Sequence, residues 1–241
     1  MIKLGSLFSG IGGFELGLER AIPGLQTVWQ VEQNEFCQQV LKKHWKNSKI
    51  YDDVETVGKH NLEPVDIICG GFPCQDVSVL SNGEGLDGKK SRLWFEMYRI
   101  IRELRPKIAI IENSSALIIR GLSTIIEELA SIGYACEWRI IRAYEFGLPH
   151  RRARCFVVAY PDKNRNRSQK QICSRWAINN KILYREKAYW EGRIIESRIR
   201  RGNNGIPNRL DRIKALGNSI VPQCSQYIGE CILKSGLMEE I

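Results

Sequence analysis

Two short apolar runs that each end in a glycine-rich turn constrain the fold of this 241-residue chain most strongly. The first run leads into Phe8-Ser-Gly-Ile-Gly-Gly13, and the second, Val65–Cys69, leads into Gly70-Gly-Phe-Pro-Cys-Gln75. A buried strand that ends in a glycine turn is typical of an open α/β sheet, which binds ligands at the carboxyl ends of its strands. We therefore expect both turns to lie at one edge of the same sheet, with the Cys74 thiol presented there.

The remaining apolar residues alternate between strand-type runs and helix-type spacing, which predicts an α/β fold. The sheet is mostly parallel, has helices on both faces, and ends in a hairpin-like pair of strands. Predicted strands span residues 3–8, 27–31, 65–69, 108–112, 134–141 and 155–160, and predicted helices include 14–21, 35–45, 93–104 and 122–132. We expect residues 1–160 to form one catalytic and cofactor-binding domain, 161–209 a small basic insert, and 210–241 a segment that returns to the first domain.

The net charge of +9 is concentrated in one part of the chain. Residues 150–215 hold 18 Lys and Arg against 5 Asp and Glu, whereas the rest holds 18 basic and 22 acidic residues. The basic segment also contains Trp176, Tyr184, Tyr189 and Trp190. A charge run is often only a solvated face, but cations interleaved with aromatic rings suit phosphate contacts and base stacking. The segment therefore predicts nucleic-acid binding.

Several classes of protein are disfavoured by composition. The sequence has no apolar run near the roughly 20 residues of a membrane span, and its first residues lack a secretory h-region, so we expect a cytoplasmic protein. Its eight cysteines form no Cys-x-x-Cys pair and do not cluster with the three histidines. We therefore expect reduced thiols and no metal site.

The first glycine turn departs from the dinucleotide fingerprint, because Glu15 occupies the place of its third glycine. Glu32 follows Gly12 by 20 residues, at the end of the next predicted strand, where a carboxylate can accept the two hydroxyls of a ribose. Asp53 follows the presumed third strand and is placed to bind an adenine amino group. These residues favour a nucleoside cofactor without a pyrophosphate, although the turn could also serve only a steric purpose.

Cys74 and Glu112 are candidate reactive groups. A thiol directly after a strand, near helix N-termini and arginines, can ionise and act as a nucleophile, although most cysteines are structural. Glu112 ends the apolar strand 108–112, where a carboxylate needs a partner or a raised pKa. A helix cap or a salt bridge is the alternative role for Glu112. The glycine- and lysine-rich segment 81–92 could fold over a bound polyanion.

Five motifs, taken in order, resemble those of the DNA (cytosine-5)-methyltransferase family. They are Phe8-Ser-Gly-Ile-Gly-Gly13, Gly71-Phe-Pro-Cys-Gln75, Glu112-Asn113, His150-Arg-Arg-Ala-Arg154 and Gly217-Asn-Ser-Ile-Val-Pro222. The resemblance covers residues 1–160 and 210–235, and the order of five motifs makes it specific. Since only about 50 residues form the insert, the chain resembles compact, phage-type members with a shortened target-recognition region.

The resemblance implies a Rossmann-like fold that binds S-adenosyl-L-methionine and methylates C5 of a flipped cytosine in double-stranded DNA. By this resemblance the Cys74 thiolate adds to C6, Glu112 binds the N3 edge and Arg154 binds the base carbonyl. The implied cofactor residues are Phe8, Gly10, Ile11, Gly12, Glu32, Asp53, Pro73, Leu93 and Asn218. Expected nucleic-acid contacts are Gln75, Ser78, Arg92, Arg152, Arg175 and Arg185. We also expect a monomer, with a cognate restriction endonuclease as a potential partner.

Three positions depart from the family pattern: Gln33 stands where an aromatic residue is common, Ser114 replaces a valine and His150 replaces a glutamine. Together with the short insert, they leave three alternatives open. The chain could bind DNA without turnover, could modify tRNA, or could be a dinucleotide-dependent oxidoreductase. The Cys-Phe-Thr signature of the tRNA branch is absent from the sequence, and Glu15 and the basic insert disfavour the oxidoreductase.

Overall fold

The computed structural model describes residues 1–73, 92–162 and 209–240, and these residues build a mixed sheet of seven strands in the order β3-β2-β1-β4-β5-β7-β6. Strands β1 to β5 pair in parallel, whereas β7 pairs antiparallel with both β5 and β6. The predicted α/β class and the hairpin-like closing pair are therefore confirmed. The strands are β1 Ile2–Leu7, β2 Leu25–Val31, β3 Lys49–Tyr51, β4 Ile67–Gly70, β5 Ile108–Ser114, β6 Tyr134–Arg142 and β7 Ala153–Pro161.

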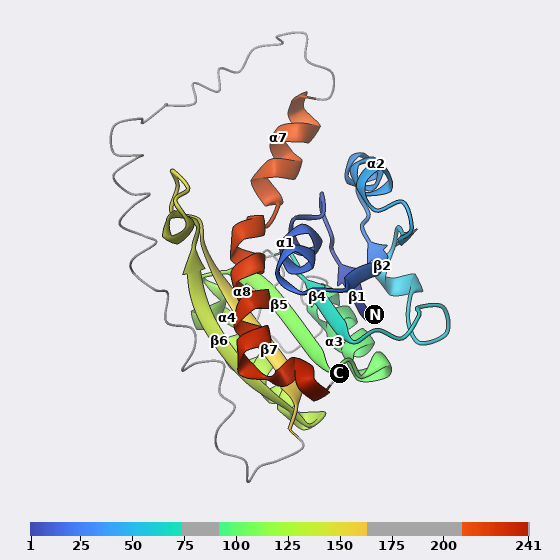
Figure 1. The fold of residues 1–241 in the computed structure, drawn as a ribbon, viewed down its shortest axis with the longest axis vertical. Coiled ribbons are helices and arrows are strands. Elements are labelled where there is room, and N and C mark those ends of the chain that lie inside the picture. Colours follow the sequence, from blue (N-terminus) through green and yellow to red (C-terminus); the bar gives the residue numbers. More distant parts are fainter. Residues whose placement is uncertain (74–91, 163–208, 241) are drawn as a thin grey trace.

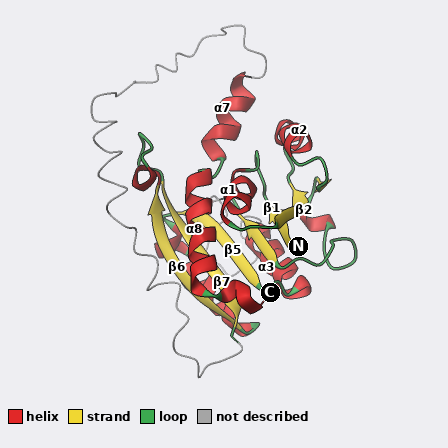
Figure 2. Cartoon of the chain, in the orientation of Figure 1, coloured by secondary structure: helices red, strands yellow, loops and turns green. Residues whose placement is uncertain are grey.

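Helices cover both faces of the sheet (Figures 1 and 2). They are α1 Gly13–Ala21, α2 Glu35–His44, α3 Arg92–Leu104, α4 Leu117–Arg120, α5 Leu122–Ser131, α7 Arg209–Asn218 and α8 Pro222–Ser235. Single 3₁₀ turns are η1 Val54–Thr56, η3 Ala143–Phe146 and η5 Leu237–Glu240. The sequence patterns predict the long helices to within a few residues, but they do not predict α4 or the 3₁₀ turns.

Alternate residues of the central strands enter two separate hydrophobic cores. Ile108 and Ile110 of β5 pack with the apolar side chains of α1 and α8, whereas Ala109 and Ile111 pack with those of α3 and α5. A strand with a helix layer on each face must be apolar on both, because its side chains alternate between the two faces. This requirement explains why β5 is a continuous apolar run in the sequence.

The C-terminal helix α8 lies beside α1, although the two helices are at opposite ends of the chain (Figure 1). Ser225 Oγ donates a hydrogen bond to the Gly13 carbonyl at 3.1 Å. Glycines at the contact let the helices approach: a Cβ on Gly229 would lie 2.6 Å from that of Ala21. The close packing holds the segment after residue 209 against the first glycine turn.

Within the described ranges, none of the helices has the length and apolar content that a bilayer span requires. The same residues contain no group of three or more His, Cys, Asp or Glu side chains arranged to bind a metal ion. The proposed insert, residues 161–209, lies almost entirely outside the described part of the chain. The division into domains therefore stays a prediction.

Replacing Gly17 with alanine should separate α1 from α8. The new Cβ would lie 2.0 Å from Ser225 Oγ and 2.2 Å from the Pro222 carbonyl oxygen. Overpacking of this kind costs about 1–3 kcal/mol, which urea denaturation would measure. Gly217→Ala is the matched control, because a Cβ on this α7 residue would lie within 4 Å of no described heavy atom outside its own helix backbone. It should leave stability unchanged or raise it by up to about 1 kcal/mol. Equal losses in both variants would contradict the packing argument.

Candidate active site

A cavity of about 870 Å³ opens at the carboxyl ends of the parallel strands. Phe8 and Gly10 follow β1, Glu32 follows β2, and Gly71 follows β4, so the strand ends bring these positions to one place. Every predicted cofactor residue except Ile11 and Gly12 lines this cavity, and so do Glu112 and Arg154. The lining also includes Gln33, Asn34, Cys37, Asp52, Glu55, Phe72, Asn113, Ser114, Asp211 and Ala215.

The turn after β1 is held to the end of β2 by Glu32. The Gly10 N–H donates to Glu32 Oε2 and the Asn34 N–H donates to Oε1, each at 2.8 Å. Phe8 and Gly10 have φ values of 55° and 57°, a left-handed backbone that an ordinary residue such as phenylalanine rarely adopts. The two hydrogen bonds fix the Glu32 carboxylate at the cavity wall, and each of its oxygens keeps a lone pair for a ligand.

Ile11 and Gly12 follow Gly10 in the glycine turn but do not line the large cavity. They line a neighbouring cavity of about 550 Å³ together with Leu16, His150 and residues at the start of α8. A Cβ on Gly12 would lie 2.3 Å from the Trp45 ring, so this glycine lets the residue after α2 pack against the turn. The structure therefore gives Gly12 a packing role that its position in the motif did not reveal.

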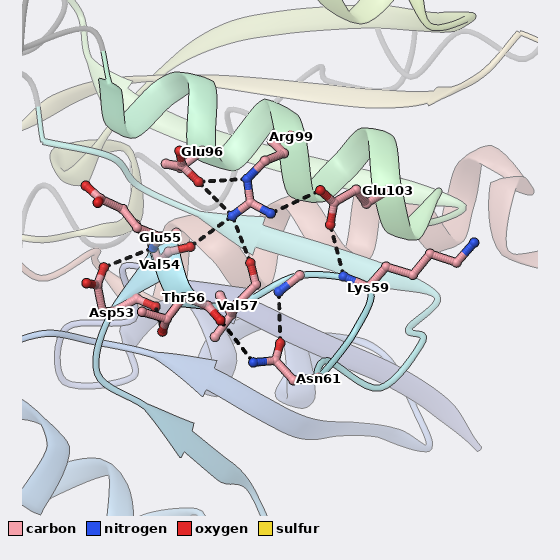
Figure 3. A network of polar contacts seen from close by, with 11 residues as sticks. Asp53, Val54, Glu55, Thr56, Val57, Lys59, Asn61, Glu96, Arg99 and Glu103 are labelled. Atoms are coloured by element: carbon pink, nitrogen blue, oxygen red, sulfur yellow. Dashed lines mark hydrogen bonds and ion pairs between the residues drawn. The ribbon is translucent and has the colours of Figure 1, made fainter.

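Asp53 precedes the one-turn helix η1 and caps it. Its Oδ1 accepts a hydrogen bond from the Glu55 N–H at 2.9 Å, as Figure 3 shows. An aspartate in this position satisfies a backbone donor that the helix itself cannot pair. The cap orients the Asp53 carboxylate at the wall of the 870 Å³ cavity.

Glu112 and Arg154 form an ion pair on neighbouring strands, with Arg154 Nε 2.9 Å from Glu112 Oε1. Antiparallel pairing places Glu112 opposite Phe156, two residues from Arg154, so the two charged side chains leave the same face of the sheet. A Cβ on Gly71 would lie 2.7 Å from Glu112 Oε2. Glycine at the end of β4 therefore leaves the space that this carboxylate occupies.

The Glu112 side chain is buried at the cavity wall, since only 8% of the residue is exposed. Burial raises the pKa of its carboxyl from 4.5 to about 7, although the charges of Arg154 and Arg152 oppose the increase. Near neutral pH the carboxyl is thus divided between its two protonation states. It can accept a proton from a bound base edge or donate one to it.

Asn113 anchors the segment that leads to Cys74. Its Nδ2 donates to the Phe72 carbonyl at 2.9 Å, and its Oδ1 accepts from the Ser114 N–H at 2.8 Å. Pro73, the last described residue before Cys74, lines the same cavity as Glu112. The predicted residues Cys74, Gln75, Ser78, Arg175 and Arg185 lie outside the described residues, as does the side chain of Arg92.

Arg152 connects the start of β7 to the link between α7 and α8. Its two terminal nitrogens donate to the carbonyls of Gly217 and Ser219, each at 2.6 Å. Asn218, between those residues, lines the cavity. The sequence suggested a DNA contact for Arg152, and this role stays a prediction, but the structure shows that its guanidinium also holds the C-terminal segment.

Sequence patterns also missed the buried surroundings of Glu15. This α1 residue is fully buried, and its Oε1 accepts from Gln30 Nε2 at 2.9 Å. Burial raises the pKa of its carboxyl, although the hydrogen bond from Gln30 opposes the increase. A glutamate within an apolar helix stripe was the signal that could have identified a buried polar cluster beneath the turn.

Comparisons with known proteins agree with this geometry. Residues 2–197 match the model of the C-5 cytosine-specific DNA methylase family. The Type II methyltransferase M.Sau3AI of Staphylococcus aureus is 33% identical over 216 residues, which are 81% of this chain and 51% of that protein. M.NgoBI of Neisseria gonorrhoeae is 30% identical over 166 residues, 67% of this chain and 51% of that protein. The chain thus spans about half the length of these curated relatives.

A solved structure shares the fold. The Entamoeba histolytica methyltransferase EhMeth superposes with a TM-score of 0.59 at 23% identity, over 68% of this chain and 55% of the other. This structural similarity supports the α/β methyltransferase fold that the strand order indicates.

The buried Glu112 carboxyl should make stability depend on pH. Because its pKa is raised in the folded state to about 7, its contribution is complete below the unfolded-state pKa and is lost as the pH rises through 7. The loss should reach about 3 kcal/mol in the free energy of unfolding, relative to Glu112→Gln. Urea denaturation of both proteins at several pH values between about 5 and 8 measures it.

Arg154→Met serves as the companion variant in this series. Since the Arg154 charge lowers the pKa of Glu112, its removal should move the pH at which stability declines upward. Parallel stability curves for the wild type and Glu112→Gln would contradict the assignment.

Proposed function

This chain belongs to the C-5 cytosine-specific DNA methylase family, and we propose that it methylates C5 of cytosine in double-stranded DNA with S-adenosylmethionine as the donor. One observation supports the proposal above the others. Seven of the nine residues predicted to hold the cofactor line a single cavity together with Glu112 and Arg154, which are predicted to hold the base. A methyl group passes directly between two bound molecules, so the two sets of residues must share one space.

The chemistry of the cavity fits the proposed cofactor. Its described lining carries the carboxylates of Glu32, Asp52, Asp53, Glu55, Glu112 and Asp211. Arg154 is the one Lys or Arg in the described lining, and it is paired with Glu112. Such a wall attracts a cation and hydroxyl groups but repels a pyrophosphate. S-adenosylmethionine, with a sulfonium, an ammonium group and a ribose, suits it better than a dinucleotide does.

Glu32 and Asp53 have distinct proposed roles in holding the cofactor. Glu32 is fixed by the N–H groups of Gly10 and Asn34, and its carboxylate accepts hydrogen bonds from the ribose hydroxyls. Asp53, fixed as the cap of η1, accepts the adenine amino group. When bound, S-adenosylmethionine supplies an electrophilic methyl group.

In the proposed reaction Cys74 acts as the nucleophile. Its thiolate forms a bond to C6 of a flipped cytosine, and the electron pair displaced from the C5–C6 double bond makes C5 nucleophilic. C5 then takes the methyl group, which leaves S-adenosylhomocysteine. Transfer of the C5 proton to a water molecule lets the thiolate leave as the double bond re-forms. Pro73, the residue before Cys74 in the sequence, lines the cavity beside Phe72.

Glu112 and Arg154 are proposed to bind the base. Protonated Glu112 donates a hydrogen bond to N3 as negative charge builds in the ring, while the Arg154 guanidinium donates to the O2 carbonyl. The 2.9 Å contact between Arg154 Nε and Glu112 Oε1 holds both groups in place before the base arrives. Prepositioned donors stabilise developing charge more effectively than donors that must reorient.

A covalent trapping assay tests the proposed chemistry. Wild-type protein and S-adenosylmethionine should form a stable adduct with duplex DNA that carries 5-fluorocytosine, because C5 then lacks a proton to lose. Cys74→Ser should form no adduct, and its methylation rate should fall about a thousandfold or more, since removal of a nucleophile costs that much or more. A pool of duplexes covering all short sites removes the need to know the target sequence.

Cys136→Ser is the matched control, because the Cys136 thiol of β6 does not line the cavity. It should trap DNA as the wild type does. A wild type that binds DNA and cofactor without trapping would favour a binding protein without turnover, whereas trapping on tRNA alone would favour the RNA-modifying alternative. The restriction endonuclease partner and the monomeric state stay predictions.

A further inference from the structure

A single arginine holds the one-turn helix that presents Asp53. Arg99 of α3 directs Nη2 at the carbonyls of Val54 and Val57, at 3.2 and 2.8 Å. Figure 3 shows its guanidinium between α3 and this short segment. Carbonyls at the end of a helix have no partner within it and need an external donor. Arg99 supplies that donor, although it lies 45 positions after Val54 in the sequence.

Two glutamates on the same helix fix the plane of the Arg99 guanidinium. Glu96 Oε2 lies 2.8 Å from Nε and 2.6 Å from Nη2, and Glu103 Oε1 lies 3.1 Å from Nη1. The arginine side chain is 26% exposed, with the glutamates at 19% and 29%. A guanidinium is rigid and planar. When its other nitrogens are paired, Nη2 can therefore point in only one direction, toward the segment after Asp53.

Further polar contacts of this segment lead to α3, back to the segment itself, or to β1, β2 and β3. Glu103 Oε2 accepts from the Lys59 N–H at 2.9 Å. Asn61 Nδ2 donates to the Thr56 carbonyl at 3.0 Å, and its Oδ1 accepts from the Gly58 N–H at 2.9 Å. No regular strand or long helix spans residues 52–66. Their conformation therefore depends on side-chain bonds such as these and on buried apolar side chains, which include Val54, Val57, Leu62 and Val65.

Arg99 thereby joins two walls of the large cavity. One wall is formed by Asp52, Asp53 and Glu55, and the other includes Leu93, in the first turn of α3. Leu93 and Arg99 lie on the same helix, so the position of the carboxylates relative to Leu93 is set through the arginine. The helix α3 is also the first element after the segment that contains Cys74.

We propose that Arg99 is a positioning residue for cofactor binding, which fixes the Asp53 wall against α3 without touching the cofactor. The inference rests on the proposed function, because it assigns the cofactor to that wall. The proposal predicts a change in cofactor affinity without a change in the methyl-transfer step. Loss of Arg99 should weaken binding at the adenosine end of the site, while Glu112 and Arg154, on β5 and β7, keep their geometry.

Calorimetric binding of S-adenosylhomocysteine tests the proposal without requiring methyl transfer. Arg99→Met should bind this product about tenfold more weakly than the wild type, as the loss of one or two charge-assisted hydrogen bonds predicts. In the methylation assay its KM for S-adenosylmethionine should rise by a similar factor, and kcat at saturation should stay within about twofold. Arg99→Lys should lose less, since it keeps the charge between the glutamates but has only one nitrogen for all of its acceptors.

Arg102→Met is the matched control on the same helix. Arg102 is exposed and lies over the Tyr98 ring, 5.8 Å from its centroid, so cofactor affinity should not change. Wild-type affinity in both Arg99 variants would overturn the inference, as would a loss of kcat with KM unchanged. If Arg99→Met does not fold, Arg99→Lys and Glu103→Gln carry the same comparison. A wild type that binds no S-adenosylhomocysteine would overturn the proposed function as well, whereas binding that is insensitive to Arg99 would overturn this inference alone.

Discussion

The ion pair between Glu112 and Arg154 is the interaction on which the site depends. A carboxylate within a buried strand would ordinarily be excluded by its desolvation cost. Here the guanidinium lies 2.9 Å away and the missing side chain of Gly71 leaves space for the second oxygen. The desolvation cost that remains raises the pKa of the Glu112 carboxyl to about 7. The burial that raises the pKa of the Glu112 carboxyl therefore also places its proton at the cavity wall.

A second set of polar contacts positions the opposite end of the cavity. Glu32 is held by backbone donors, Asp53 caps a single helical turn, and Arg99 holds that turn against α3. Neither carboxylate lies within a strand or a long helix, where the backbone pairs with itself. Loops need side-chain partners to keep one conformation, and here charged side chains supply them. The cofactor wall is therefore built mainly from electrostatic contacts, while the sheet beneath it is built from apolar packing.

Much of the fold could be predicted from local sequence patterns. The strand-type and helix-type spacings identified the α/β class and the antiparallel closing pair, and the ordered motifs identified the family. The motifs also selected residues that line one cavity, although no finding tests their chemical roles. Arg99 was not selected, since an arginine on an amphipathic helix resembles any solvated cation. Arg152 was assigned only to DNA, because a sequence does not show that the carbonyls of Gly217 and Ser219 lie within its reach.

The sequence by itself determined most of the strands and the long helices, which turns need glycine, and which residue types gather at the strand ends. These properties follow from local steric preference and from the period of apolar residues, so a short window contains them. Only the tertiary structure decided that Arg154 faces Glu112 and that Arg99 reaches the carbonyl of Val57. Those contacts depend on strand order, register and the approach of α3 to a distant loop. They are set by packing over the whole chain, which no local pattern encodes.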